Sequence, residues 1–103
     1  MSQAEYVAVC PVDEVPEGRG RAIEVEGVRI ALFRDGERVY ALFGQCPHAG
    51  GSMGHGWVED GEAVCPLHRW HFRLASGRCT SVRGEALSTF PCEVRDGVVW
   101  VSL

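Results

Sequence analysis

Two short stretches decide how this chain folds and what it binds: Cys46-Pro47-His48-Ala49-Gly50-Gly51 and Cys65-Pro66-Leu67-His68-Arg69-Trp70. Each stretch offers one thiol and one imidazole a few residues apart, so both side chains can chelate from the tip of one loop. Thiolate and imidazole are the groups that hold zinc and some iron–sulfur clusters in proteins. We therefore expect the two stretches to form one metal site, which the rest of the fold must bring together.

The composition is that of a single folded domain. The chain has 103 residues, of which 46% are hydrophobic, which suits one modest core and excludes a disordered chain. A net charge of −4 leaves no basic footprint, so we expect no nucleic-acid partner. Residues 1–18 lack the basic and apolar regions of a signal peptide, and no apolar run approaches the roughly 20 residues of a membrane helix. We expect a cytoplasmic protein that does not enter a membrane.

Turn signals between strand-forming runs predict an all-β fold. The signals are Glu26-Gly27, Asp35-Gly36, Asp60-Gly61, Ser76-Gly77 and Asp96-Gly97. Asp-Gly favours a type I′ hairpin, because Gly accepts the positive φ that this turn requires. Strands are expected at Tyr6–Cys10, Ala22–Glu26, Val28–Arg34, Arg38–Gly44, Trp57–Val58, Glu62–Val64, His71–Leu74, Cys92–Arg95 and Val98–Ser102, with a loop or single helical turn at Val12–Glu17. Many short strands joined by hairpins indicate an antiparallel β-sandwich or small barrel.

Zinc is the competing interpretation of the two stretches. A structural zinc site would be expected to show paired C-x-x-C knuckles or a helix with H-x3-H spacing. The first pair here is C-x-H, and no helical pattern follows His68. We assign neither His55 nor His71 as a ligand. The cysteines outside the motif (Cys10, Cys79, Cys92) are expected to be buried thiols in a reducing compartment.

The two stretches resemble the cluster-binding boxes of the Rieske 2Fe–2S family. Gly56-Trp57-Val58 and Leu74-Ala75-Ser76-Gly77 are also similar to the soluble ferredoxins of that family. The resemblance implies one 2Fe–2S cluster, with Cys46 and Cys65 on the inner iron and His48 and His68 on the outer iron. We expect a single Rieske domain over 1–103, with a base of 1–44 and 83–103 and a cluster-binding subdomain of about 45–82 formed by two hairpin loops.

Four positions around the boxes imply a low reduction potential. High-potential members of the family carry an extra Cys in each box, joined by a disulfide, where this chain has Gly51 and Leu67. They also place Ser and Tyr hydroxyls against cluster sulfurs, where this chain has Trp70 and Phe72. Hydrogen bonds to sulfur stabilise the reduced cluster. Without them, we expect a potential near the lower end of the Rieske range of about −150 to +300 mV.

The resemblance implies an electron carrier without a complete active site of its own. The chain has no room for the mononuclear iron domain of an oxygenase and no Gly-rich dinucleotide fingerprint. We therefore expect redox proteins as partners, namely a reductase and a terminal reductase or oxygenase. Two systems fit: the small subunit of assimilatory NAD(P)H nitrite reductase, and the ferredoxin component of a ring-hydroxylating dioxygenase. Leu67, Trp70 and the Pro-free segment 79–90 favour the first, and a zinc-stabilised binding module stays open as an alternative of another class.

Overall fold

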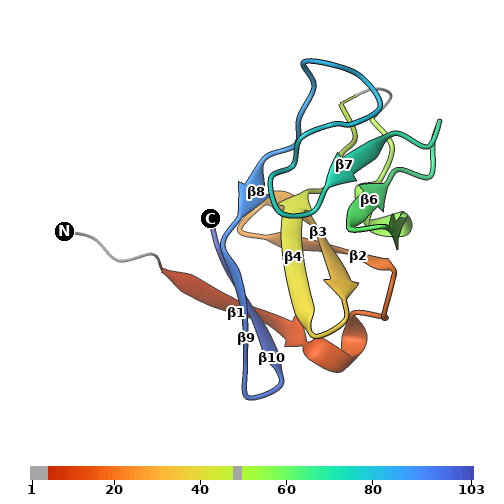
Figure 1. Ribbon diagram of the computed structural model, residues 1–103. Helices are drawn as coiled ribbons and strands as arrows, with labels where there is room; N and C mark the ends of the chain where they lie inside the picture. Colours follow the sequence, from red (N-terminus) through yellow and green to blue (C-terminus); the bar gives the residue numbers. More distant parts are fainter. Residues whose placement is uncertain (1–4, 48–49) are drawn as a thin grey trace.

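The computed structural model describes residues 5–47 and 50–103, whose strands form three antiparallel sheets (Figure 1). The first sheet, in the order β1-β10-β9, contains β1 (Tyr6–Pro11), β9 (Cys92–Arg95) and β10 (Val98–Ser102). The second, in the order β2-β3-β4-β8, contains β2 (Gly20–Val25), β3 (Val28–Asp35), β4 (Arg38–Phe43) and β8 (Thr89–Phe90). The third contains β5 (Trp57–Glu59), β6 (Glu62–Val64) and β7 (His71–Arg73). Two 3-10 turns, η1 (Val12–Glu14) and η2 (Met53–His55), complete the described part, where no helix is long and apolar enough to cross a membrane.

The all-β prediction is confirmed, and the expected strands lie within two residues of the observed ones at either end. Strand β8 is the one that the sequence pattern did not indicate. Two residues are too few to show an alternating pattern, and the strand exists because Ala41 and Leu42 of β4 pair with it. A long-range partner thus creates an element that local sequence does not encode.

Most of the expected turns have the expected geometry. The two-residue turns at 26–27, 60–61 and 96–97 have positive φ at both positions, as type I′ turns require. The expectation of such a turn at Asp35-Gly36 was wrong. Asp35 pairs with Arg38, so the central residues are Gly36 and Glu37, and only Gly36 has a positive φ, of 66°. That pattern belongs to type II′ turns.

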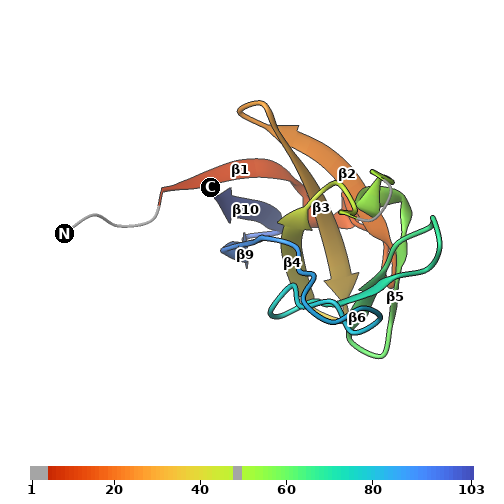
Figure 2. The same ribbon diagram turned by 90° about the horizontal axis from the view of Figure 1, so that it is seen from above.

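Strand β3 links the base of the molecule to the candidate site, because both of its faces are buried. Ile30 and Leu32 face the core between the first two sheets. Ala31 and Phe33 face a second core, which lies beneath β6 and β7. All four are at most 1% exposed, as expected for a strand whose successive side chains enter two different cores. Figure 2 shows the outer sheets on opposite sides of the central one.

The turn η2 sits against β2 at a distance that only glycine permits. A Cβ on Gly54 would lie 2.5 Å from the backbone N and Cα of Ala22, well inside ordinary contact. The backbone N–H of Met53 donates to the carbonyl of Gly44 at 2.9 Å and fixes the same turn to the end of β4. The segment that follows the first box is therefore anchored to the central sheet.

Candidate metal centre

The two predicted boxes form two loops with the same closure. The backbone N–H of Cys46 donates to the carbonyl of Gly51 at 2.8 Å, and that of Cys65 donates to the carbonyl of Trp70 at 2.9 Å. Each cysteine is therefore the first residue of a short loop that returns to its own start. Strand β4 leads into the first loop, and the second loop connects β6 with β7.

The thiols of Cys46 and Cys65 lie close together in an apolar environment. Cys46 is 2% exposed and Cys65 is fully buried, in the core that also contains Met53 and Phe72, and neither forms a disulfide. Burial raises the pKa of the Cys65 thiol to about 11; the backbone of Leu67 opposes this rise, and a hydrogen bond with Cys46 adds to it. Buried thiols of this kind become thiolates when a cation compensates their charge, so the pair suits a bound metal.

Gly51 sets how closely the two loops approach each other. A Cβ at this position would lie 3.0 Å from Cδ1 and 3.2 Å from Cγ of Leu67, and 3.3 Å from Sγ of Cys65. The two positions that carry the extra cysteines in high-potential family members are thus in contact here. Leu67 is 47% exposed, so the surface beside the thiols is partly apolar. A side chain at 51 would therefore press against Leu67 and the Sγ of Cys65.

His68 lies in the second loop with an exposed side chain and an unusual backbone. Its φ is 65° and that of the next residue, Arg69, is 56°. Two successive non-glycine residues in the left-handed region are uncommon, and each costs on the order of 1–3 kcal/mol. Such strain is concentrated at functional sites, where the surrounding fold maintains it.

The ligand set predicted from the sequence is only partly visible. His48 lies outside the described residues, and its role stays a prediction. Within residues 5–47 and 50–103, no three His, Cys, Asp or Glu side chains converge on a common metal position. What the described residues provide is the pair of buried thiols and the strained loop that carries His68.

One polar contact near the site had no signal in the sequence. Nδ1 of His71 lies 3.0 Å from Oε1 of Glu62, and both side chains are partly buried. His71, which we did not assign as a ligand, is therefore paired with a carboxylate of the neighbouring strand. The pairing depends on the register of β6 with β7, and the loop of 65–70 between them contains no turn motif that fixes this register.

The remaining candidates occupy ordinary positions. His55 is exposed in η2, Trp70 packs against the core that holds the thiols, and Phe72 is fully buried. Cys10 and Cys79 are buried as expected, whereas Cys92 is only partly so.

Comparison with known proteins agrees with this geometry. The family model for the Rieske [2Fe-2S] domain matches residues 5–91. The 3-phenylpropionate/cinnamic acid dioxygenase ferredoxin subunit of Shigella flexneri serotype 5b (strain 8401) is 38% identical over 99 residues, which cover 94% of this chain and 92% of that protein.

Two solved structures have a similar fold. A putative nitrite reductase (NADPH) small subunit superposes with a TM-score of 0.86 at 28% identity, covering 96% of this chain and 99% of that one. The ferredoxin of carbazole 1,9a-dioxygenase from Nocardioides aromaticivorans IC177 gives a TM-score of 0.86 at 26% identity, covering 96% and 98%. The chain therefore belongs to the Rieske [2Fe–2S] domain family, and its cofactor is a 2Fe–2S cluster of the Rieske type.

Proposed function

We propose that this chain is the ferredoxin component of a dioxygenase system, a one-electron carrier whose cluster is held by Cys46, His48, Cys65 and His68. The observation that carries the proposal is the contact between the two closed loops. Gly51 meets Leu67 and the Sγ of Cys65, and the thiols of Cys46 and Cys65 share one apolar environment. In this assignment the thiolates bind the inner iron, and the imidazoles bind the outer iron near the surface.

The residues beside the ligands support a low potential. Two thiolates and two neutral imidazoles leave the oxidised cluster near zero net charge, so Rieske centres have higher reduction potentials than four-cysteine ferredoxins. Phe72 is fully buried and Trp70 packs against the same core, and neither side chain has a hydroxyl group to bond to a cluster sulfur. We therefore infer a potential in the lower part of the Rieske range.

The dioxygenase system is favoured by sequence similarity. The match to a dioxygenase ferredoxin subunit reaches 38% identity over nearly the whole length of both chains. The nitrite reductase small subunit is the second candidate, because the structure of one superposes with a TM-score of 0.86. The resemblance noted from the sequence, Leu67 and Trp70 in the second box, points the same way. In either system the chain receives single electrons from a reductase and delivers them to a terminal enzyme.

The proposal extends to the organisation of the domain and its location. Residues of about 45–82 form the cluster-binding subdomain, and 1–44 with 83–103 form the base that supports it. A reducing cytoplasm suits the described cysteines, since none of the five forms a disulfide.

The ligand assignment is tested by spectroscopy of two histidine variants. The purified protein should be red-brown, and its reduced form should give an EPR signal with an average g value below that of all-cysteine ferredoxins. His68→Ala should lose this signal, whereas His55→Ala, at an exposed position in η2, should keep it. A normal Rieske signal in His68→Ala, or a colourless protein with one bound zinc, would show that the assignment is wrong.

The choice of system is tested by electron delivery. The reduced protein is mixed with a dioxygenase oxygenase component or, separately, with the sirohaem subunit of an assimilatory nitrite reductase, and its reoxidation is followed in a stopped-flow spectrometer. Rapid reoxidation by the oxygenase with its substrate supports the dioxygenase proposal. Rapid reoxidation by the sirohaem subunit with nitrite would replace it with the second candidate.

A further inference from the structure

Positive charge is concentrated in one segment of this acidic chain. The whole chain has a net charge of −4, yet residues 63–84 contain four arginines and no Asp or Glu. The rest of the chain is therefore more negatively charged than the chain as a whole. The segment includes the second box, β7 and the loop that follows it, so the cationic part of the molecule is next to the candidate cluster site.

Three of these arginines line a single cleft. Arg73, Arg78 and Arg83, together with Cys79, Thr80 and Gly84, surround a volume of about 340 Å³. All three arginine side chains are exposed, and in the part of the chain that the structure describes none of them pairs with a carboxylate. Glu62 is opposite Arg73 in the β6–β7 ladder, but its carboxylate is bonded to His71 instead.

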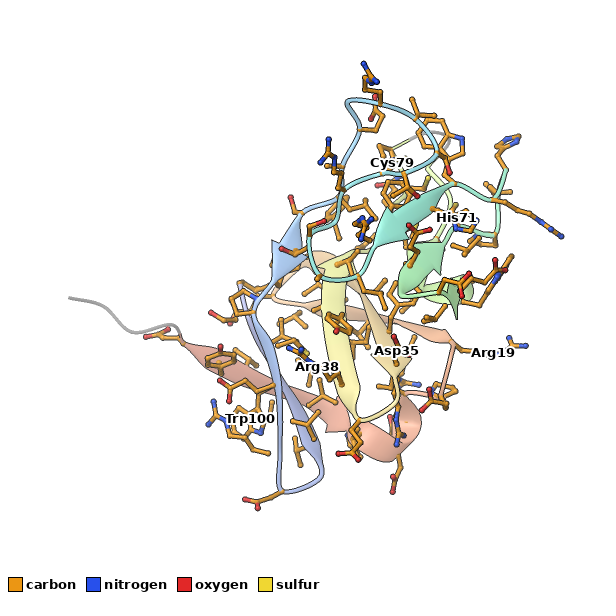
Figure 3. All side chains as sticks on the ribbon, in the orientation of Figure 1. Arg19, Asp35, Arg38, His71, Cys79 and Trp100 are labelled. Carbon is orange, nitrogen blue, oxygen red and sulfur yellow. The ribbon has the colours of Figure 1, made fainter. Side chains whose placement is uncertain are left out.

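Backbone and core contacts hold this cleft in shape. The backbone N–H of Arg73 donates to the carbonyl of Arg78 at 2.9 Å, and the N–H of Thr80 donates to the carbonyl of His71 at 2.9 Å. Cys79 is 5% exposed and belongs to the same core as Cys46 and Cys65. Arg73 is thus the last residue of β7, and Arg78 and Arg83 belong to the segment after it, which is anchored through Cys79 in the core that contains the two thiols. Figure 3 shows Cys79 and His71 at one end of the molecule and Trp100 and Arg38 toward the other.

We propose that the cleft lined by Arg73, Arg78 and Arg83 is a docking surface for a carboxylate-bearing surface of the protein that exchanges electrons with this chain. The inference rests on the proposed function, since it assumes electron exchange at the adjacent cluster. Unpaired guanidinium groups on an ordered loop bind carboxylates with charge-assisted hydrogen bonds, often bidentate ones. A cationic patch on an anionic molecule also orients it during approach, so an acidic partner meets the cluster end first.

The sign of a salt effect tests the cleft directly. Dithionite-reduced protein passes one electron to ferricyanide, which becomes ferrocyanide, and the second-order rate is measured between low and high NaCl concentration. If the net charge governs the encounter of two anions, added salt accelerates it; if the local arginines govern it, added salt slows it. We expect the wild-type rate to fall with salt, and an increase with salt would overturn the proposal.

Two triple variants with the same change of net charge separate position from total charge. R73Q/R78Q/R83Q should lower the rate at low salt on the order of tenfold and reverse the sign of the salt effect. R19Q/R29Q/R38Q removes three arginines of the base that form no ion pair within residues 5–47 and 50–103, and it should retain the wild-type sign. Equal behaviour of the two variants would contradict the docking cleft.

The class of ligand is tested by binding rather than by electron transfer. An octaglutamate peptide, titrated into the oxidised protein, should shift the amide signals of residues 73–84 in ¹H–¹⁵N NMR spectra. The shifts should be absent in R73Q/R78Q/R83Q. Inorganic phosphate at equal ionic strength should cause no comparable shift. Saturable binding of phosphate by the cleft would replace a protein partner with a small anion.

The spectrum of the cluster keeps the two hypotheses separate. All three proteins should show the same visible and EPR spectra, because none of the substituted residues is a proposed ligand. A missing Rieske signal in the wild type would refute the proposed function. Intact clusters with no difference between the triple variants would refute the docking cleft alone.

Discussion

A disulfide can be introduced between the two cluster loops by G51C/L67C. In a disulfide, the Cβ of one cysteine lies about 3.0 Å from the Sγ of the other, given a sulfur–sulfur bond of about 2.05 Å and standard angles. A Cβ on Gly51 would lie 3.2 Å from Cγ of Leu67, the atom that Sγ of a cysteine at 67 would replace. Position 51 does not have a positive φ, so its backbone accepts a side chain. The bond should therefore form without rearrangement of the loops.

The stabilisation follows from the length of the closed segment. A crosslink that closes a loop of about 15 residues stabilises a fold by roughly 3 kcal/mol in the chain-entropy model, and engineered bonds often give less. For a domain of about 100 residues, each kcal/mol raises Tm by about 4 °C or more. We expect Tm of the oxidised double variant to exceed that of its reduced form by on the order of 10 °C.

Thiol titration and thermal unfolding test this prediction together. The wild type contains five cysteines, so the denatured, cluster-free double variant should also show five free thiols, with two of its seven cysteines bonded. The single variants G51C and L67C, which should each show six, are the controls. Seven free thiols in the double variant, or a Tm that reduction leaves unchanged, would refute the proposed proximity of the two loops.

Three further outcomes are expected. Phe72→Tyr introduces a hydroxyl group at a fully buried position beside the thiols. One hydrogen bond of about 1.5 kcal/mol to a charged sulfur should raise the one-electron reduction potential, measured by voltammetry, by roughly 60 mV. An unchanged potential in a variant with an intact cluster would contradict this. Gly54→Ala should reduce the free energy of unfolding by about 3 kcal/mol, because its Cβ would meet the backbone of Ala22. The control, Gly84→Ala, has nothing within 4 Å of its Cβ and a φ of 90°, and should reduce the free energy of thermal unfolding by about 1 kcal/mol. Equal reductions in the two variants would argue against the close approach of η2 to β2. Burial, with the charge of Cys10 as a second cause, raises the pKa of the Cys92 thiol from 9.0 to about 12, so the stability contributed by the protonated thiol is complete below pH 9 and is lost as the pH rises toward 12. The alkaline loss of stability, followed by circular dichroism, should therefore be shallower in Cys92→Ala. An equally steep loss in that variant would show that ionisation of Cys92 does not cause the alkaline loss.

The two box motifs and the turn residues made much of the fold predictable from local sequence. Gly at 27, 61 and 97 adopts the positive φ of a type I′ turn, and this preference does not depend on distant residues. The strand-forming runs between these turns then placed the strands nearly where they lie. The exceptions were a two-residue strand, β8, and the turn after Asp35, and in both the pairing with β4 overrides the local signal.

Sequence alone predicted the chemistry of this protein: the thiols and imidazoles of the two boxes indicated a metal site, and their resemblance to the Rieske family implied a 2Fe–2S cluster before any contact was known. Only the tertiary structure decided which surfaces surround that chemistry. The contact of Gly51 with Leu67, the pair of Glu62 with His71 and the cleft of Arg73, Arg78 and Arg83 join residues through strand register and loop packing. Ligand spacing is a local property of the chain, whereas the distance between two loops results from the sum of all the contacts that support them.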